Sequence, residues 1–76
     1  MSLSLKVESY AGYKADERPQ QFTIRGRPFE VLEVLDRWYD PEAIFFRVRA
    51  DDGNLYILRH DERVGDWTLE SFRAAR

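Results

Sequence analysis

Three arginines and one phenylalanine form the group of residues in this sequence that is best suited to bind an anion. Arg47 and Arg49 are two positions apart, so on a β-strand they lie on the same face. Phe45 shares that face, and Arg59 joins it in one of two registers of the hairpin that follows. Grooves for single-stranded nucleic acid combine such groups, because the charges hold the backbone and a ring stacks on a base. The competing interpretation is that these arginines pair with acids on neighbouring strands.

The charge balance favours the competing interpretation. The 76 residues include 12 basic and 14 acidic side chains, for a formal net charge of -2. A domain that binds nucleic acid is usually strongly basic, and this one is not. All basic residues except Lys6 and Lys14 are arginines. Biased codon usage is the preferred explanation, and selection for forked contacts to anions is the alternative.

Residues for catalysis or metal binding are few. His60 is the only histidine, and its neighbour Asp61 would point to the opposite face of a strand, so the pair would not form a catalytic base and its orienting group. Asp51, Asp52 and Asn54 lack the distal glutamate and the helical frame of a calcium loop, and turn formation explains them better. The chain has no cysteine. We therefore expect no enzyme, no metal site and no cofactor.

Aromatic residues make up 14% of the chain and recur about once per expected strand, as the filling of a small barrel requires. Trp38 and Trp67 are expected in the core. Tyr39 is expected to be exposed, as a candidate contact for a partner protein or a second copy of the chain. The residues expected to fill the interior are Phe22, Phe29, Trp38, Phe46, Tyr56 and Trp67.

Apolar and polar residues alternate along most of the chain, which predicts β-strands. In the third segment the apolar phase slips at Leu32–Glu33, which predicts a β-bulge, and a short helix over residues 31–35 is the alternative. A connection is expected over residues 10–19, a tight turn over 26–28, and a frayed or helical tail from 71 to 76. The expected strands are 3–8, 21–25, 29–39, 44–50, 55–60 and one that begins at 67–69.

The turn at residues 51–54 decides where Arg59 lies. If Asp52–Gly53 is a two-residue loop, Arg59 shares the face of Phe46. If Asp51 and Asp52 form a type I turn with Gly53 as the bulge residue, the register shifts by one and Arg59 joins the other two arginines. We prefer the second register, because it keeps a charge off the more apolar face.

These elements predict a mostly β, single-domain fold over residues 1–76. We expect a small antiparallel, partly open barrel of the SH3 or OB type, with five or six strands and a long bulged second or third strand. Residues 1–17 would supply an N-terminal strand and a connection, residues 18–72 the core, and residues 73–76 a tail. No stretch reaches the roughly 18 apolar residues of a membrane helix, so we expect a cytoplasmic protein without membrane contact.

Several short motifs occur between residues 18 and 72: residues 18–22 (RPQQF), 26–27 (GR), 30–38 (EVLEVLDRW), 46–49 (FRVR), 52–53 (DG), 56–59 (YILR) and Trp67. Together they resemble a family of small bacterial domains of unknown function. Relatives of that family occur alone and as a C-terminal module of proteins that resemble Y-family DNA polymerases of mutagenic repair. The resemblance implies an association with DNA repair and carries no catalytic residues over.

Together these observations predict a non-enzymatic binding or interaction module of unknown partner, either another protein or a second copy of the chain. The alternative is a nucleic-acid-associated accessory module linked to DNA repair, with Arg47, Arg49, Arg59 and Phe45 as the binding residues. A small enzyme is the third and weakest hypothesis.

Overall fold

The computed structural model describes residues 3–10 and 18–74, and all its regular structure is β-strand. The connection expected between the first two strands lies largely in residues 11–17, outside the described residues. The strands are β1 (Leu3–Tyr10), β2 (Arg18–Ile24), β3 (Arg27–Tyr39), β4 (Ala43–Ala50), β5 (Leu55–Asp61) and β6 (Asp66–Arg73).

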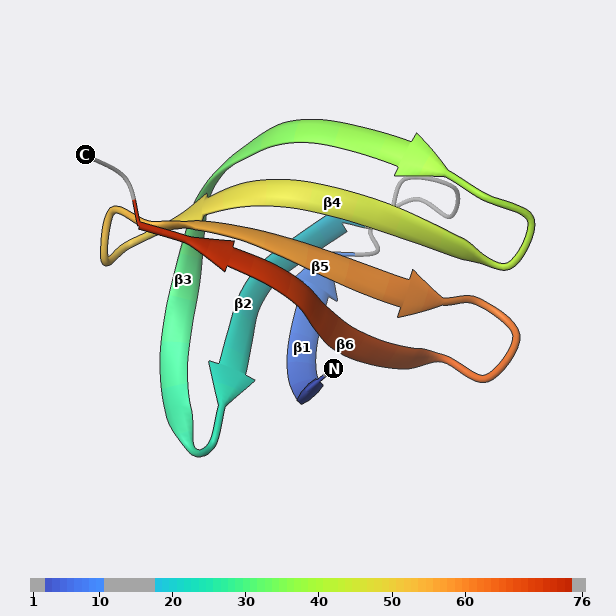
Figure 1. Ribbon diagram of the computed structural model, residues 1–76. Coiled ribbons are helices and arrows are strands. Elements are labelled where there is room, and N and C mark those ends of the chain that lie inside the picture. Colours follow the sequence, from blue (N-terminus) through green and yellow to red (C-terminus); the bar gives the residue numbers. More distant parts are fainter. Residues whose placement is uncertain (1–2, 11–17, 75–76) are drawn as a thin grey trace.

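The six strands form a small antiparallel barrel, which confirms the expected fold class (Figure 1). Every strand pairs with its neighbours in sequence, so the order is that of a meander and not the Greek key of an OB barrel. The ring is closed where β1 returns to β6, through the pairs that join Leu3–Leu5 to Trp67–Leu69. The barrel is therefore closed and not partly open as expected, and the pairing that closes it is the shortest among the described residues.

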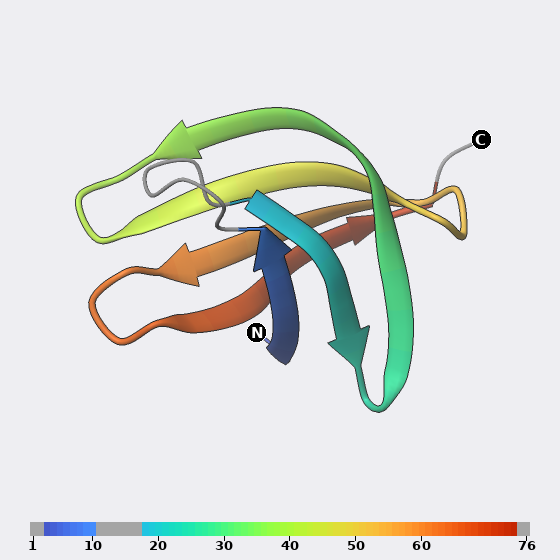
Figure 2. The same cartoon turned by 180° about the vertical axis from the view of Figure 1, so that it is seen from behind.

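β3 is the strand that connects the two halves of the barrel. It pairs with β2 over residues 27–30 and with β4 over residues 31–39. Its first half lies beside β2, which separates it from β1, and its second half curves over to join the sheet of β4, β5 and β6, as both views show (Figures 1 and 2). The expectation of a long bulged strand is confirmed, and the helical alternative for residues 31–35 is wrong.

The register of β3 against β4 shifts twice. One shift lies between Val31 and Glu33, at the predicted bulge, and a second lies between Val34 and Asp36. Each shift exchanges the inward and outward positions of all later residues. The second bulge had no counterpart in the sequence-based prediction.

This second bulge explains why Trp38 is not in the core. With one bulge, the residues that follow Val34 at even spacing would face inward, and Trp38 would be among them. With two, Arg37 takes the inward position and its guanidinium lies 5.3 Å from the ring of Phe46. Trp38 is 38% exposed on the opposite face, so its expected place in the core is wrong.

The other expected core aromatics are buried. Phe22 contacts Phe29 and Tyr56 at centroid distances of 5.2 and 5.0 Å, and Phe46 contacts Trp67 at 5.7 Å. The buried cluster consists of Phe22, Phe29, Phe46, Val48, Ala50, Tyr56, Leu58 and Trp67.

Several boundaries differ from those expected. β1 extends to Tyr10 and β2 begins at Arg18, so both strands continue into the expected connection over residues 10–19, because Tyr10 and Arg18 pair with each other. The turn between β2 and β3 is formed by Arg25 and Gly26, both with positive φ (51° and 84°), and Ile24 pairs with Arg27 across it. That is the geometry of a type I′ hairpin, and it lies one residue earlier than the expected turn over 26–28. β6 also continues to Arg73 instead of fraying at residue 71, because its last part pairs with β5.

The hairpin between β4 and β5 has the preferred register. Gly53 has a φ of 85° and donates a hydrogen bond to the carbonyl of Ala50 at 2.9 Å, which closes a type I turn with a glycine bulge. Arg59 therefore pairs with Phe45, and its side chain shares the face of Arg47.

A hydrogen bond from the core to this turn gives a test of the hairpin. The hydroxyl of the buried Tyr56 donates to Oδ2 of Asp52 at 2.6 Å. Tyr56→Phe should lower the free energy of unfolding by about 1 kcal/mol, the usual net value of one hydrogen bond. Urea unfolding measures it, with Tyr39→Phe as the control, since Tyr39 is 63% exposed. An equal effect of both substitutions would contradict a stabilising role for this contact.

The same contact predicts a change of stability at alkaline pH. Burial and the nearby Asp52 carboxylate raise the pKa of Tyr56 to about 12. An unfolded tyrosine has a pKa of about 10, so only the unfolded chain releases this proton between those values. The free energy of unfolding should therefore fall as the pH rises from about 10 through 12. Ultraviolet absorbance titration of the wild type and Tyr56→Phe should differ by one transition near pH 12.

Candidate functional site

The solvent-facing side of β4, β5, β6 and the second half of β3 carries the residues expected to bind an anion, and we call it the outer face. Phe45 pairs with Trp38 on one side and with Arg59 on the other. Two further rows run parallel to this one across the sheet. The outward residues are Glu33, Asp36, Trp38, Phe45, Arg47, Arg49, Leu55, Ile57, Arg59, Thr68, Ser71 and Arg73.

One row forms a stack of flat groups across three strands. The rings of Trp38 and Phe45 are parallel within 1°, with centroids 5.5 Å apart. On the other side of Phe45, the guanidinium carbon of Arg59 lies 6.0 Å from the ring centroid. A contact of this kind stabilises by about 0.5–1 kcal/mol at an exposed site. The row therefore presents the indole of Trp38 at the surface of the sheet, where its contact with Phe45 holds it in place.

Arg47 and Arg49 are paired with acids on β3, as the competing interpretation expects. Arg47 lies 3.9 Å from Asp36, and Arg49 forms an ion pair and a hydrogen bond with Glu33. All four side chains are about half exposed, so each pair contributes roughly 0–1 kcal/mol. The structure thus brings the three predicted arginines to one face, but each has a counter-charge, since Arg59 lies beside Asp61.

A shallow depression lies beside these pairs on the outer face. Its volume is about 150 Å³, and its floor is formed by Leu55 and Ile57 of β5 with Ser71 of β6. Arg47 and Arg73 line its two sides. Arg73 was not predicted as a site residue, because the last strand was expected to end before it.

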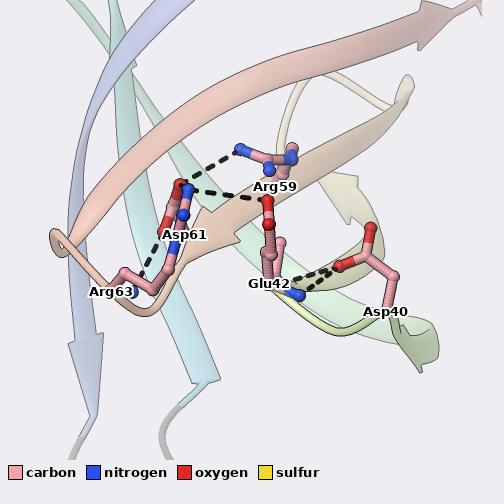
Figure 3. Close-up of polar contacts among 6 residues, drawn as sticks. Asp40, Glu42, Arg59, Asp61 and Arg63 are labelled. Atoms are coloured by element: carbon pink, nitrogen blue, oxygen red, sulfur yellow. Dashed lines mark hydrogen bonds and ion pairs between the residues drawn. The ribbon is translucent and has the colours of Figure 1, made fainter.

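Arg59 forms an ion pair with Asp61, which lies at the end of the same strand, β5. The Asp61 side chain is largely buried, and its carboxylate lies 3.8 Å from Arg59 (Figure 3). It also accepts hydrogen bonds from the backbone N–H, Nε and Nη2 of Arg63 at 3.0, 3.3 and 3.1 Å. The hydrogen bonds from Arg63 keep the pKa of Asp61 below its ordinary value, although burial acts in the opposite direction.

Arg63 connects two loops at this end of the barrel. Its Nη2 lies 3.5 Å from Glu42, in the turn between β3 and β4 (Figure 3). That turn is itself closed by Asp40, whose carboxylate accepts hydrogen bonds from the N–H groups of Glu42 and Ala43 at 2.9 and 2.7 Å. These contacts fix the strand ends next to the Trp38 stack.

The remaining candidates for chemistry serve packing or turns. The His60 ring lies on Trp67 at 4.2 Å and 8° on the inner side of the sheet, away from the contacts of Asp61. The carboxylate of Asp52 accepts hydrogen bonds from Tyr56 and Asn54. Among the described residues, no three histidine, cysteine or acidic side chains cluster in a way that could hold a metal ion.

Tyr39 is exposed as predicted, but it does not belong to the outer face. It pairs with Ile44 on β4, one position beyond Trp38, so its side chain lies on the other side of the sheet. Its role as a partner contact stays a prediction. The aromatic residue that the structure places beside the arginines is Trp38.

A second hollow of about 420 Å³ lies where β3 leaves β2. It includes Leu32, which is 62% exposed on the first bulge. Its lining residues are Pro19, Gln20, Glu30, Val31, Leu32, Glu33 and Val34.

Comparison with family models, with curated proteins and with solved structures finds no match to this chain. The resemblance to a bacterial domain family therefore stays a prediction. In the part of the chain that the structure describes, no helix has the length and apolarity needed to cross a membrane.

Replacing Asp61 tests whether it fixes this end of the barrel. Asp61→Asn should lower the free energy of unfolding at pH 7, because the ion pairs with Arg59 and Arg63 are lost. The folded state lowers the pKa of Asp61, so its contribution is present above the unfolded pKa of about 3.9 and disappears as the pH falls through the folded value. Urea unfolding should show a gap between variant and wild type at pH 7 that closes at low pH.

The matched control is Asp66→Asn, because Asp66 pairs with Asp61 across the same hairpin and is exposed. A gap of equal size for both variants, or one that does not change with pH, would contradict the structural role of Asp61.

Proposed function

We propose that the chain is a non-enzymatic interaction module that binds a partner protein through its outer face. The observation that carries this proposal is the stack of Trp38, Phe45 and Arg59, which presents a partly exposed indole on a fixed surface. Tryptophan and arginine are the residues most often found at the centre of protein interfaces. Large aromatic residues of a small domain are normally buried. An aromatic side chain that its neighbours hold at the surface therefore indicates an interaction site.

Charge supports a protein partner over a nucleic acid. Arg47 and Arg49 already have carboxylates beside them, and the chain has a net charge of -2. Trp38 and Arg59 flank Phe45 on its two sides, so its ring has no free face for a base. The alternative, a nucleic-acid-associated module linked to DNA repair, rests on the resemblance and on the arginines alone.

Truncation of the indole tests the proposal. Candidate partners are the proteins that bind to the immobilised wild-type chain. Their affinity for Trp38→Ala should be at least about tenfold lower than for the wild type, since a hot-spot residue contributes about 2 kcal/mol or more. Val64→Ala is the control, because Val64 is 66% exposed and is not part of the stack. Affinities are measured by surface plasmon resonance with each purified candidate.

Light scattering on the wild type decides whether the partner is a second copy, since the monomer mass is 9.1 kDa. Binding that is equally strong for Trp38→Ala and Val64→Ala would contradict the proposed surface.

Affinity for single-stranded DNA separates the proposal from its alternative. We expect a fluorescent oligo-dT to show negligible binding to the wild type at physiological salt, and none for the double variant Arg47→Glu, Arg49→Glu. Fluorescence anisotropy against salt concentration measures it. Binding that weakens steeply with salt and is lost in the variant would overturn the proposal in favour of the nucleic-acid module.

A further inference from the structure

We infer that the depression between Arg47 and Arg73 binds a carboxylate next to an aliphatic side chain, on an acidic and apolar segment of the partner protein. This inference rests on the proposed function, because the depression lies on the same outer face. It adds the chemistry of the partner, which the Trp38 stack does not specify.

The strand register places two cations around an aliphatic floor. Ile57 of β5 pairs with Arg47 on β4 and with Ser71 on β6, and Leu55 pairs with Arg73. Strands that are two apart in a sheet are separated by roughly 10 Å, so β5 supplies the floor and the arginines stand on opposite sides of it. A ligand in this position meets apolar surface below and a guanidinium on each side.

The charges around the depression are available to a ligand. Within the described part of the chain, Arg73 forms no ion pair, and the lining contains no acid. Arg47 has a partner in Asp36, but the contact is 3.9 Å long between side chains that are 47% and 56% exposed. A carboxylate that approaches along the floor can take up a shorter, forked contact with either guanidinium.

Size and lining select a protein segment as the occupant. About 150 Å³ is well below the roughly 300–1,000 Å³ of sites that enclose a small-molecule ligand, so one or two side chains fit and a whole cofactor does not. The floor consists of two aliphatic side chains and Ser71, and it has no ring on which a base could stack. In a segment with an acidic residue beside an aliphatic one, the carboxylate can pair with the arginines on the sides and the aliphatic side chain can pack on the floor.

An NMR titration of the full, isotope-labelled chain tests the inference. The probe is a blocked pentapeptide with one aspartate between two leucines, and the control peptide has asparagine in place of the aspartate. We expect the amide signals of Ile57 and Ser71 to shift, with binding of the asparagine peptide about tenfold weaker, as the loss of a charged hydrogen bond implies.

Arg73→Gln should weaken binding of the aspartate peptide by a similar factor, and Arg47→Gln provides an independent second measurement. Arg25→Gln is the matched control, because Arg25 is exposed in the turn between β2 and β3. Signal dispersion in the spectra shows that each variant is folded.

Equal binding of the two peptides, or unchanged binding by both Arg73→Gln and Arg47→Gln, would overturn the inference. An oligo-dT that shifts the same amide signals more strongly than the peptide would also overturn it. If binding of a partner protein still requires Trp38 in that case, only the inference about the depression is wrong and the proposed function stands. If binding of partner proteins does not require Trp38, the proposed function is wrong, whatever the result with the peptide.

Discussion

The two bulges in β3 are the constraint on which the rest of the structure depends. One strand of 13 residues must pair with β2 at its start and with β4 at its end, so it has to bend between the two halves of the barrel. A bulge bends a strand and increases its twist, at the cost of an unpaired residue. Two of them restore the original phase of the pleat, and this decides which side chains of the second half reach the core.

The outer face follows from that choice of phase. Because Arg37 takes the inward position, Trp38 is left outside and stacks on Phe45 from the neighbouring strand. The same phase puts Asp36 opposite Arg47, so this ion pair and the aromatic stack have one origin, whereas Glu33 lies between the two bulges and faces Arg49 because of the first. A strand with only the first bulge would bury the indole and turn Asp36 away from Arg47.

The turns were predictable from the residues that form them. Which face each side chain takes late in a long strand was not, because it depends on every bulge that precedes it. Asp51–Asp52–Gly53 specifies its own turn, so the hairpin register and the place of Arg59 followed from three residues. The first bulge in β3 was visible because Val31 and Val34 are both apolar and out of step. The second leaves no such mark, since Leu35 tolerates a half-buried position, and Trp38 was therefore assigned to the core. Arg73 was missed because the pairing that extends β6 is a contact with β5, remote in sequence.

The ion pairs on the outer face shape how a partner would be recognised. Compensated arginines give little long-range attraction, so the surface would not steer a polyanion towards it, and association would proceed at the rate of a neutral patch. At contact distance the same groups act differently, because an incoming carboxylate can compete for a guanidinium whose partner is loosely placed, as Asp36 is for Arg47. Such a surface discriminates between partners by complementarity at contact distance. The indole of Trp38 supplies apolar area at one end of the face. The guanidinium groups at the other end disfavour any segment that leaves them unpaired.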